Sequence, residues 1–334
     1  MTALKNPRVQ KLHDARSALD DAMVLLALHE LGAYAALAEG PATYEDLAER
    51  LQAMPVRLRS FLELAVHLGL LQSQGALFSL FEGDEEVFDP KRPHGTGLPS
   101  TTLHQLFETK GRAVGVLRGD PFIETPAAGS ESSAKHRANF LRYMDSVTQE
   151  AASELAALVP ERAIHKIVDV GSGPGTYSHA LLHRFKTAQA LLIDRPNAEK
   201  EVLAIAHERG LSERVSFTGL DVTRDRIPGD QDLAILSNVI HCYGPETNQQ
   251  LIQRLAESLA PNGLLIIKDS ALLDDRSGPP GVLRFAVSMA LFSQEGRVYP
   301  SAEVVQWCRA AGLSHIRVEA LHEPADNYAV IATR

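Results

Sequence analysis

The chain has 334 residues, of which 45% are hydrophobic and 22% are charged, and its formal net charge is −9 at pH 7. This composition is ordinary for a globular protein, and the chain is longer than a single hydrophobic core usually supports, so we expect more than one domain. The acidic balance argues against a nucleic-acid partner. No apolar run approaches the roughly 18 residues that span a bilayer, and residues 1–10 lack the apolar core of a signal peptide, which predicts a cytoplasmic protein without a membrane anchor.

Residues 1–100 are predicted to form a winged helix-turn-helix domain. An apolar helix is expected over residues 18–37, Thr43 and Asp46 are spaced as a capping box before a second helix, residues 56–71 predict a third, and residues 75–88 a two-stranded wing. This domain invites a DNA-binding hypothesis. Phosphates would be repelled by the acidic residues of the wing, which are Glu82, Asp84, Glu85, Glu86 and Asp89.

Residues 101–160 are predicted to form a helical linker and a lid over the substrate entrance. Residues 91–130 are rich in proline, glycine, serine and threonine, and residues 135–159 predict one long helix. Four of its side chains share one broad face: Phe140, Tyr143, Met144 and Thr148. From the residues alone, such a stripe is more typical of core packing than of a binding site.

The most informative stretch is Ile-Val-Asp-Val-Gly-Ser-Gly-Pro-Gly at residues 167–175. An apolar strand, with Asp169 at its end, leads directly into a loop that holds Gly171, Gly173 and Gly175 at every second position. Glycines let the backbone approach a ligand closely, and the helix expected over residues 176–185 turns its N-terminus toward the loop. The pattern predicts a site for a nucleotide-like cofactor.

The spacing of the glycines distinguishes between cofactors. A dinucleotide-binding loop has the pattern G-x-G-x-x-G, whereas this loop is G-x-G-x-G after an acid. The Asp169 carboxylate would repel a pyrophosphate but would pair with the ammonium group of an amino-acid-bearing cofactor, which indicates S-adenosylmethionine. A nicotinamide-dependent oxidoreductase is the disfavoured alternative, and a purely structural turn is the plainest one.

Four further apolar runs follow, at residues 190–193, 215–220, 233–236 and 264–267, with helices expected over residues 198–208, 249–259 and 302–312. This alternation predicts an α/β fold with a Rossmann-like, doubly wound sheet over residues 161–334. Ligands bind at the carboxyl ends of such strands. There Asp194 would accept hydrogen bonds from a ribose diol and Asp221 from an adenine amino group, although a solvated strand end or a helix cap explains each acid singly.

From about residue 10 onward the chain resembles the class I S-adenosylmethionine-dependent O-methyltransferases of the acetylserotonin and caffeic-acid type. The motifs that carry the resemblance lie at residues 169–175, 193–196, 219–222, 237–241, 259–264 and 295–297. The resemblance implies a homodimer formed through the N-terminal domain. A monomer whose apolar helix packs inside its own chain is the alternative.

The resemblance also implies a catalytic histidine beyond the fourth strand, where His241 stands, and an acid on the next strand that orients it, where Asp269 stands. A neutral imidazole can take the proton of a hydroxyl that attacks the sulfonium methyl. The candidate cofactor-binding residues are Asp169, Gly171, Gly173, Gly175, Asp194, Asp221, Val222, Ser237 and Thr148. The candidate contacts of a flat, mostly apolar acceptor are Phe140, Tyr143, Met144, Asn238, Phe285, Met289 and Phe292.

Three departures from the family bear on the mechanism. Cys242 and Tyr243 follow the histidine where many plant members have Asp-Trp, Val298 replaces a second orienting glutamate, and Asp269 is one methylene shorter than the usual glutamate. These changes affect the base mechanism more than cofactor binding. If no base acts, the acceptor would be a group that needs little deprotonation, such as an acidic phenol, an amine or an enol-like carbon, and it would be methylated by proximity alone. We expect O-methylation of a small aromatic or polyketide-like compound; the alternatives are N- or C-methylation, and a family member that has lost methyl transfer.

The two cysteines, Cys242 and Cys308, are too few for a disulfide framework and lack the spacing of metal ligands. This usage fits a reducing compartment, and no metal cofactor is expected.

Overall fold

The structure is a computed structural model that describes residues 7–84, 107, 110–121, 131–321 and 326–334. It divides into two compact units, residues 1–111 and 112–334. The predictions for residues 85–89 of the wing, and for most of residues 91–130, lie outside the described residues.

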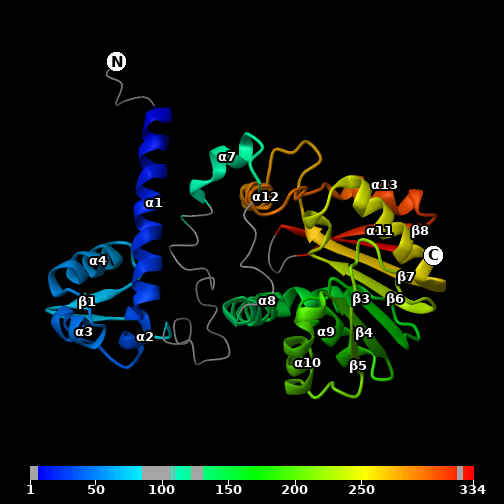
Figure 1. Ribbon diagram of the computed structural model, residues 1–334, viewed down its shortest axis with the longest axis horizontal. Helices are drawn as coiled ribbons and strands as arrows, with labels where there is room; N and C mark the ends of the chain where they lie inside the picture. The colour runs from blue at the N-terminus through cyan, green and yellow to red at the C-terminus, as the bar shows by residue number, and fades with distance from the viewer. Residues whose placement is uncertain (1–6, 85–106, 108–109, 122–130, 322–325) are drawn as a thin grey trace. The chain divides into compact units, whose positions relative to one another are not determined.

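The N-terminal unit is a small helical domain with a hairpin (Figure 1). Its elements are α1 (Pro7–Leu31), α2 (Ala33–Ala38), α3 (Tyr44–Arg50), α4 (Pro55–His67), β1 (Gln72–Gln74) and β2 (Leu77–Ser79). A core that includes Leu28, Tyr34 and Leu62 holds them together. The prediction of one helix over residues 18–37 is wrong, because Gly32 has a φ of 86°, which ends α1 and begins a new helix.

The cap of α3 is confirmed, since Thr43 Oγ1 accepts a hydrogen bond from the backbone N–H of Asp46 at 3.1 Å. The wing was placed too late along the chain. Gly75, with a φ of 62°, lies in the tight turn between the two strands rather than at the start of the first one. The third helix is also shorter than expected, because α4 ends at His67.

The second unit contains a seven-stranded sheet in the order β5-β4-β3-β6-β7-β9-β8. The first five strands in this order are parallel, and β9 and β8 are antiparallel to their neighbours. The strands are β3 (Lys166–Val170), β4 (Gln189–Asp194), β5 (Val215–Gly219), β6 (Gln231–Ser237), β7 (Leu259–Ser270), β8 (Ser314–Leu321) and β9 (Asn327–Thr333). The predicted α/β class and doubly wound sheet are confirmed.

The second unit also contains helices, most of which cover the two faces of this sheet (Figure 1). They are α7 (Ala113–Leu117), α8 (Glu131–Leu158), α9 (Thr176–Arg184), α10 (Glu199–Glu208), α11 (Pro245–Ser258), α12 (Pro280–Phe292) and α13 (Ser301–Ala310), with short 3-10 turns η2 (Pro196–Ala198) and η3 (Ile240–Cys242). In Figure 1, α8, α9 and α10 lie on one face, and α11 and α13 lie on the other. Each face has its own apolar core.

The strand order places a topological switch point at β3. The chain leaves β3 toward β4 on one side and later returns to β6 on the other, so the carboxyl end of β3 opens between two diverging connections. Ligands of doubly wound sheets bind in this crevice. The glycine loop follows β3 directly, which is where the sequence predicts the cofactor site.

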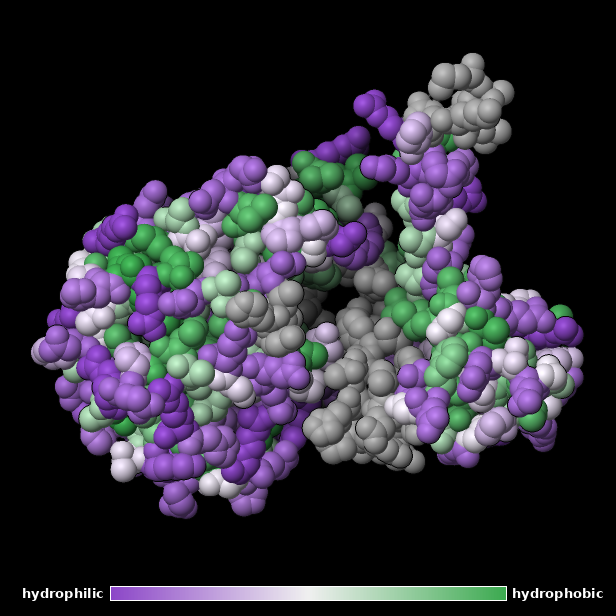
Figure 2. Space-filling view, turned by 180° about the vertical axis from the view of Figure 1, so that it is seen from behind, coloured by the Kyte–Doolittle hydropathy of each residue, from purple (hydrophilic) through white to green (hydrophobic). Residues whose placement is uncertain are grey.

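The surface drawn in Figure 2 mixes hydrophilic and apolar residues. Across the described parts of the chain, none of the helices combines the length and the apolar character needed to cross a membrane.

Candidate active site

The three glycines after β3 all have left-handed backbone conformations, with φ values of 68°, 52° and 80° at Gly171, Gly173 and Gly175. A Cβ atom on Gly171 would lie 2.5 Å from Val239 Cγ2, and one on Gly175 would lie 2.6 Å from Leu192 Cδ1. At Gly173 no described atom would lie within 4 Å. The outer glycines therefore let the loop pack onto the protein, and the middle one leaves open space beside the backbone.

The carboxylate of Asp194, at the end of β4, is tied to this loop. Its Oδ2 accepts a hydrogen bond from the backbone N–H of Gly173 at 2.7 Å, and its Oδ1 accepts one from Arg195 N–H at 2.7 Å. The acid predicted to bind the ribose thus also fixes the glycine loop. A Cβ on Gly219 would lie 2.7 Å from Pro196 Cα, so the end of β5 crosses the β4 loop closely, a contact that the sequence reasoning missed.

Asp169 is buried beneath the loop, and its Oδ2 accepts a hydrogen bond from Ser178 Oγ at 2.8 Å. Burial raises the pKa of this carboxyl to about 7, which the Ser178 hydrogen bonds oppose and the charge of Asp194 reinforces. No cation of the described residues forms an ion pair with it. The buried hydroxyls of Ser172 and Ser237 also lack partners within the described protein. These groups fit a cationic ligand that makes hydrogen bonds.

Asp221, beyond β5, lies on the surface and closes a local turn. Its Oδ1 accepts hydrogen bonds from the N–H and hydroxyl of Thr223, at 2.9 and 2.7 Å, and these bonds lower the pKa of the carboxyl. The carbonyl of Val222 accepts a hydrogen bond from Arg254 at 2.7 Å. The adenine contacts of Asp221 and Val222 remain predictions.

His241 and Asp269 form a buried pair at the ends of β6 and β7. Nδ1 of the histidine lies 2.9 and 3.0 Å from the two carboxylate oxygens, and the side chains are 12% and 3% exposed. Burial alone would lower the pKa of His241, but the charge and hydrogen bond of Asp269 raise it above its ordinary value. With Nδ1 donating to Asp269, Nε2 of the neutral ring carries the available lone pair.

An apolar wall adjoins this pair. Phe285 of α12 meets the His241 ring edge-on, with 4.9 Å between ring centroids. Val298, at the position where the family resemblance implies a second orienting glutamate, is buried with Leu272 and Val282, and Phe285 packs against the three. An apolar cluster therefore occupies the place where the resemblance would put the second glutamate.

A second polar group lies at the same edge of the sheet, and of its members only Asn238 was predicted as a site residue, an acceptor contact, whereas Lys268 and Tyr177 were assigned no role. The buried Lys268 donates from Nζ to Asn238 Oδ1 at 2.8 Å, and Asn238 Nδ2 lies 3.5 Å from the hydroxyl of Tyr177. Burial lowers the pKa of Lys268 to about 8, against the opposing effect of Asp269. In the sequence the available signal was a lysine that ends an otherwise apolar strand.

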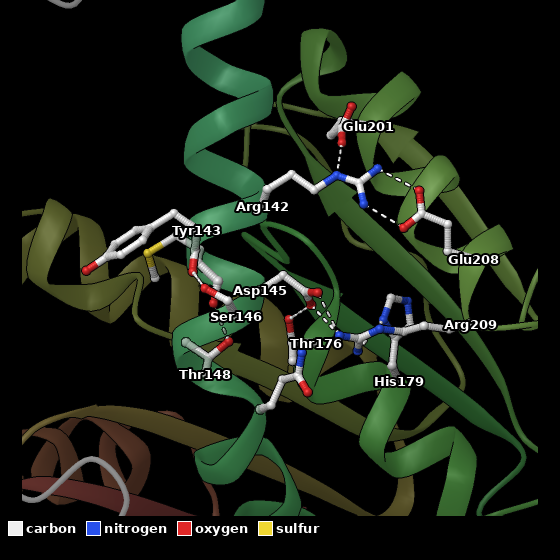
Figure 3. Close-up of polar contacts among 12 residues, drawn as sticks. Arg142, Tyr143, Asp145, Ser146, Thr148, Thr176, His179, Glu201, Glu208 and Arg209 are labelled. Carbon is white, nitrogen blue, oxygen red and sulfur yellow. Dashed lines mark hydrogen bonds and ion pairs between the residues drawn. The ribbon is translucent and has the colours of Figure 1, made fainter. Parts of the chain in front are cut away.

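Helix α8 is attached to α9 and α10 by two arginine–carboxylate clusters (Figure 3). Arg209 Nη2 donates to both carboxylate oxygens of Asp145, each at 2.7 Å, and Asp145 Oδ1 also accepts a hydrogen bond from Thr176 Oγ1 at 2.6 Å. One turn earlier, Arg142 binds Glu201 and Glu208. Because Thr176 directly follows Gly175, α8 is connected to the start of the helix behind the cofactor loop.

The predicted contact residues of α8 and α12 differ in exposure. Thr148 is buried and donates its hydroxyl hydrogen to the carbonyl of Met144, and Figure 3 shows Tyr143 pointing away from Arg142. Met144 and Met289 are half-buried, whereas Phe140 and Phe292 are 50% and 41% exposed. Their contacts with an acceptor remain predictions.

The described residues contain no cluster of three or more histidine, cysteine, aspartate or glutamate side chains that could hold a metal ion.

Two family models match the chain. The O-methyltransferase domain matches residues 114–314, and the O-methyltransferase dimerisation domain matches residues 18–87.

Curated relatives cover most of the chain at modest identity. The tetracenomycin polyketide synthesis 8-O-methyl transferase TcmO of Streptomyces glaucescens is 28% identical over 90% of this chain and 90% of its own length. The 3-hydroxy-5-methyl-1-naphthoate 3-O-methyltransferase of Streptomyces sahachiroi is 25% identical over 97% and 94%. The N,N-dimethyltransferase OxyT of Streptomyces rimosus is 25% identical over 78% of both.

Solved structures share the whole fold. The mitomycin 7-O-methyltransferase MmcR is 22% identical, with a TM-score of 0.84 and 100% of both chains covered. Human N-acetylserotonin methyltransferase in complex with SAM is 19% identical, with a TM-score of 0.81, covering 100% of this chain and 99% of that one. The resemblance drawn from the sequence motifs is confirmed, and the chain belongs to the O-methyltransferase family.

Proposed function

We propose that this enzyme transfers a methyl group from S-adenosylmethionine to a hydroxyl of a small aromatic or polyketide-like metabolite, with His241 as the general base. The observation that carries the proposal is the His241–Asp269 pair at 2.9 Å. It lies next to the glycine loop, because Gly171 packs against Val239, two residues before the histidine. Relatives that act on polyketides and on a naphthoate support the acceptor class.

The residues around β3 fit S-adenosylmethionine, which when bound supplies a methyl group on a positively charged sulfur. Asp169 would receive the ammonium of the methionyl end, which would relieve the cost of its buried carboxyl. The open backbone at Gly173 would face the cofactor, and Asp194 would accept from the ribose. The unpartnered hydroxyls of Ser172 and Ser237 add hydrogen-bonding groups at the same place.

His241 would take the acceptor's hydroxyl proton on Nε2 while Asp269 holds the ring through Nδ1. The oxygen lone pair then forms the new C–O bond, and the electrons of the breaking methyl–sulfur bond stay on the sulfur. The proton moves to a neutral imidazole, so the raised pKa of His241 requires the ring to lose its second proton before each turnover. A sulfonium cation nearby favours that loss by repelling the imidazolium.

The apolar wall of Phe285 and Val298 suits a flat acceptor held by shape. In-line placement of oxygen, methyl carbon and sulfur then supplies much of the acceleration.

Methylation of an amine or a carbon is the second candidate. The raised pKa of His241 favours it, because an imidazolium at neutral pH cannot act as a base. A relative named as an N,N-dimethyltransferase supports keeping this alternative.

Replacing His241 by Asn tests the proposal. We expect turnover of hydroxyl acceptors to fall by roughly 10²- to 10⁴-fold, the usual contribution of a general base, while the affinity for S-adenosylhomocysteine stays unchanged. The variant His165→Asn, at an exposed histidine before β3, serves as the matched control and should keep full turnover. Near-normal O-methylation by His241→Asn would remove the histidine as the base and favour transfer by proximity.

The proposal also includes a homodimer, supported by the match to the dimerisation domain. It places the reaction in the cytoplasm, which is consistent with the free thiols of Cys242 and Cys308.

A further inference from the structure

Lys268 and Asp269 are neighbours in β7 but lie on opposite faces of the sheet. Leu265 and Ile267 belong to the core on the α11 and α13 side, and strand alternation places Asp269 with them, beside His241. Leu264 and Ile266 belong to the other core, with α8 and α9, and the alternation places Lys268 on that side. The lysine therefore faces the same side of the sheet as the cofactor loop's helix, not the catalytic pair.

Hydrogen-bond donors surround the lysine on this face. Lys268 is paired in register with Ser237 of β6, so the two side chains stand next to each other, and the Ser237 hydroxyl has no partner among the described residues. Because Lys268 Nζ donates to Asn238 Oδ1, the amide NH₂ of Asn238 must point the other way, toward Tyr177. The group presents an ammonium, an amide and two hydroxyls.

Among the described residues, no charged side chain pairs with the ammonium on its own face. Lys268 is 3% exposed, no carboxylate of the described residues forms an ion pair with it, and its Nζ donates a hydrogen bond to the neutral amide of Asn238. Asp269, the acid that affects it electrostatically, accepts its hydrogen bonds from His241 Nδ1 and from the backbone N–H of Ser270. A buried ammonium with one neutral partner is costly unless an anion completes it.

We propose that Lys268, with Ser237 and Asn238 beside it, binds a carboxylate in the active site. A carboxylate has the charge that the ammonium lacks and oxygens for the neighbouring donors. Asp169 lies on the same face of the sheet, two residues after Ile167 of the same core. An acid on β3 and a base on β7 thus flank β6, an arrangement that matches the opposite charges of an amino-acid zwitterion.

This inference rests on the proposed function only for the place of the cofactor. The carboxylate has two possible sources, the methionyl end of the cofactor and an acidic acceptor. Equilibrium binding separates them and does not require His241 to act as a base, so failure of the base mechanism and failure of this inference are distinguishable.

The test compares wild type with Lys268→Met by calorimetry, using S-adenosylhomocysteine and its decarboxylated analogue. We expect the substitution to lower the affinity for S-adenosylhomocysteine roughly 10- to 100-fold, the range for a hydrogen bond to a charged group. The affinity for the decarboxylated analogue should change less than about twofold. The second arm titrates 3-hydroxy-2-naphthoate and its amide into the S-adenosylhomocysteine complex. If Lys268→Met loses affinity for the naphthoate alone, the carboxylate belongs to the acceptor, and this result also supports the inference.

Two controls keep the result interpretable. Lys166→Met removes an exposed lysine that pairs with Asp230 at the opposite end of the sheet and should change neither affinity. Lys268→Gln repeats the measurement with a polar side chain in case the methionine variant folds poorly. Equal affinities of wild type and both Lys268 variants for all four compounds would overturn the inference.

Discussion

Asp269 is shorter than glutamate by one methylene, yet both of its oxygens lie within 3.0 Å of His241 Nδ1. The reach is possible because β6 and β7 are adjacent and parallel, and their carboxyl ends lie at the same edge of the sheet. The substitution thus keeps the orienting contact. It also keeps the carboxylate buried, and the charge and hydrogen bond of this carboxylate raise the pKa of the histidine against the lowering effect of burial.

The pH dependence of turnover should report this pair. For wild type, kcat/KM for a hydroxyl acceptor is expected to rise with pH and level off above the raised pKa of His241, because only the neutral ring accepts a proton. In Asp269→Asn the raising charge is gone and burial lowers the pKa, so the plateau should begin at lower pH. Its height should fall roughly 10- to 100-fold with loss of the charged hydrogen bond. A profile that does not move in the variant would contradict this assignment.

At the residue scale, the sequence predicted single positions where a motif fixes them. The loop glycines and Asp194 follow from the strand ends, whereas the pairing of His241 with Asp269 follows from the family resemblance. Lys268 and Tyr177 were not assigned roles, because their importance depends on which face of a strand or helix turns toward the site. That information comes from the register of β6 against β7 and from the packing of α9.

Helix α8 depends on two clusters that differ in burial. Arg209 and Asp145 are 22% and 15% exposed, whereas Arg142 is 44% exposed. Removing one partner of a buried pair leaves an uncompensated charge, which costs more than removing a solvated pair. The more buried cluster, Asp145 with Arg209 and Thr176, therefore contributes most of the free energy that holds α8 to the helix behind the glycine loop.

We expect Asp145→Asn to lower the free energy of unfolding by about 2–4 kcal/mol, and Arg142→Met to lower it by about 0–1 kcal/mol. Chemical denaturation of the whole chain measures both. Asp145→Asn should also lower the affinity for S-adenosylhomocysteine, because Asp145 accepts a hydrogen bond from Thr176, which adjoins Gly175 of the glycine loop. Equal losses of stability in the two variants would show that burial does not set the strength of these clusters.

At the element scale, the alternating apolar runs predicted five strands and the helices between them. The last two strands were missed. Most residues of β8 are exposed or half-buried, so that strand has no continuous apolar run to mark it. Strand β9 is buried over most of its length, and its apolar run from Tyr328 to Ala332 was a signal that the prediction did not use. The break between α1 and α2 was also missed, because a single glycine at Gly32 interrupts an otherwise helical pattern.

The whole molecule combines a catalytic unit with a unit that matches a dimerisation domain. Its net charge of −9 and the acidic residues near the hairpin agree with use of the winged helix for protein contact rather than for DNA. Helix α1 exposes Leu12 and Leu19, which are 72% and 54% accessible and lie seven residues apart, on one side of the helix.

Light scattering should therefore give a mass of about twice 36.3 kDa for wild type. Replacing Leu12 and Leu19 by Asp should give the mass of one chain, because two buried charges would oppose the pairing of apolar helices. Leu203→Asp, at a partly exposed leucine on α10, is the control and should leave the dimer intact. A monomeric wild type would contradict the proposed assembly.

The central claim is that the glycine loop after β3 binds S-adenosylmethionine, and calorimetric titration of S-adenosylhomocysteine tests it most directly. Gly173 and Gly210 provide a matched pair, since both have left-handed backbones, with φ values of 52° and 67°, and no described atom would lie within 4 Å of an added Cβ. Alanine at either position carries the same backbone strain. We predict one binding site per chain, roughly tenfold or greater loss of affinity in Gly173→Ala, and wild-type affinity in Gly210→Ala. No binding by wild type, or equal binding by the two variants, would contradict the account.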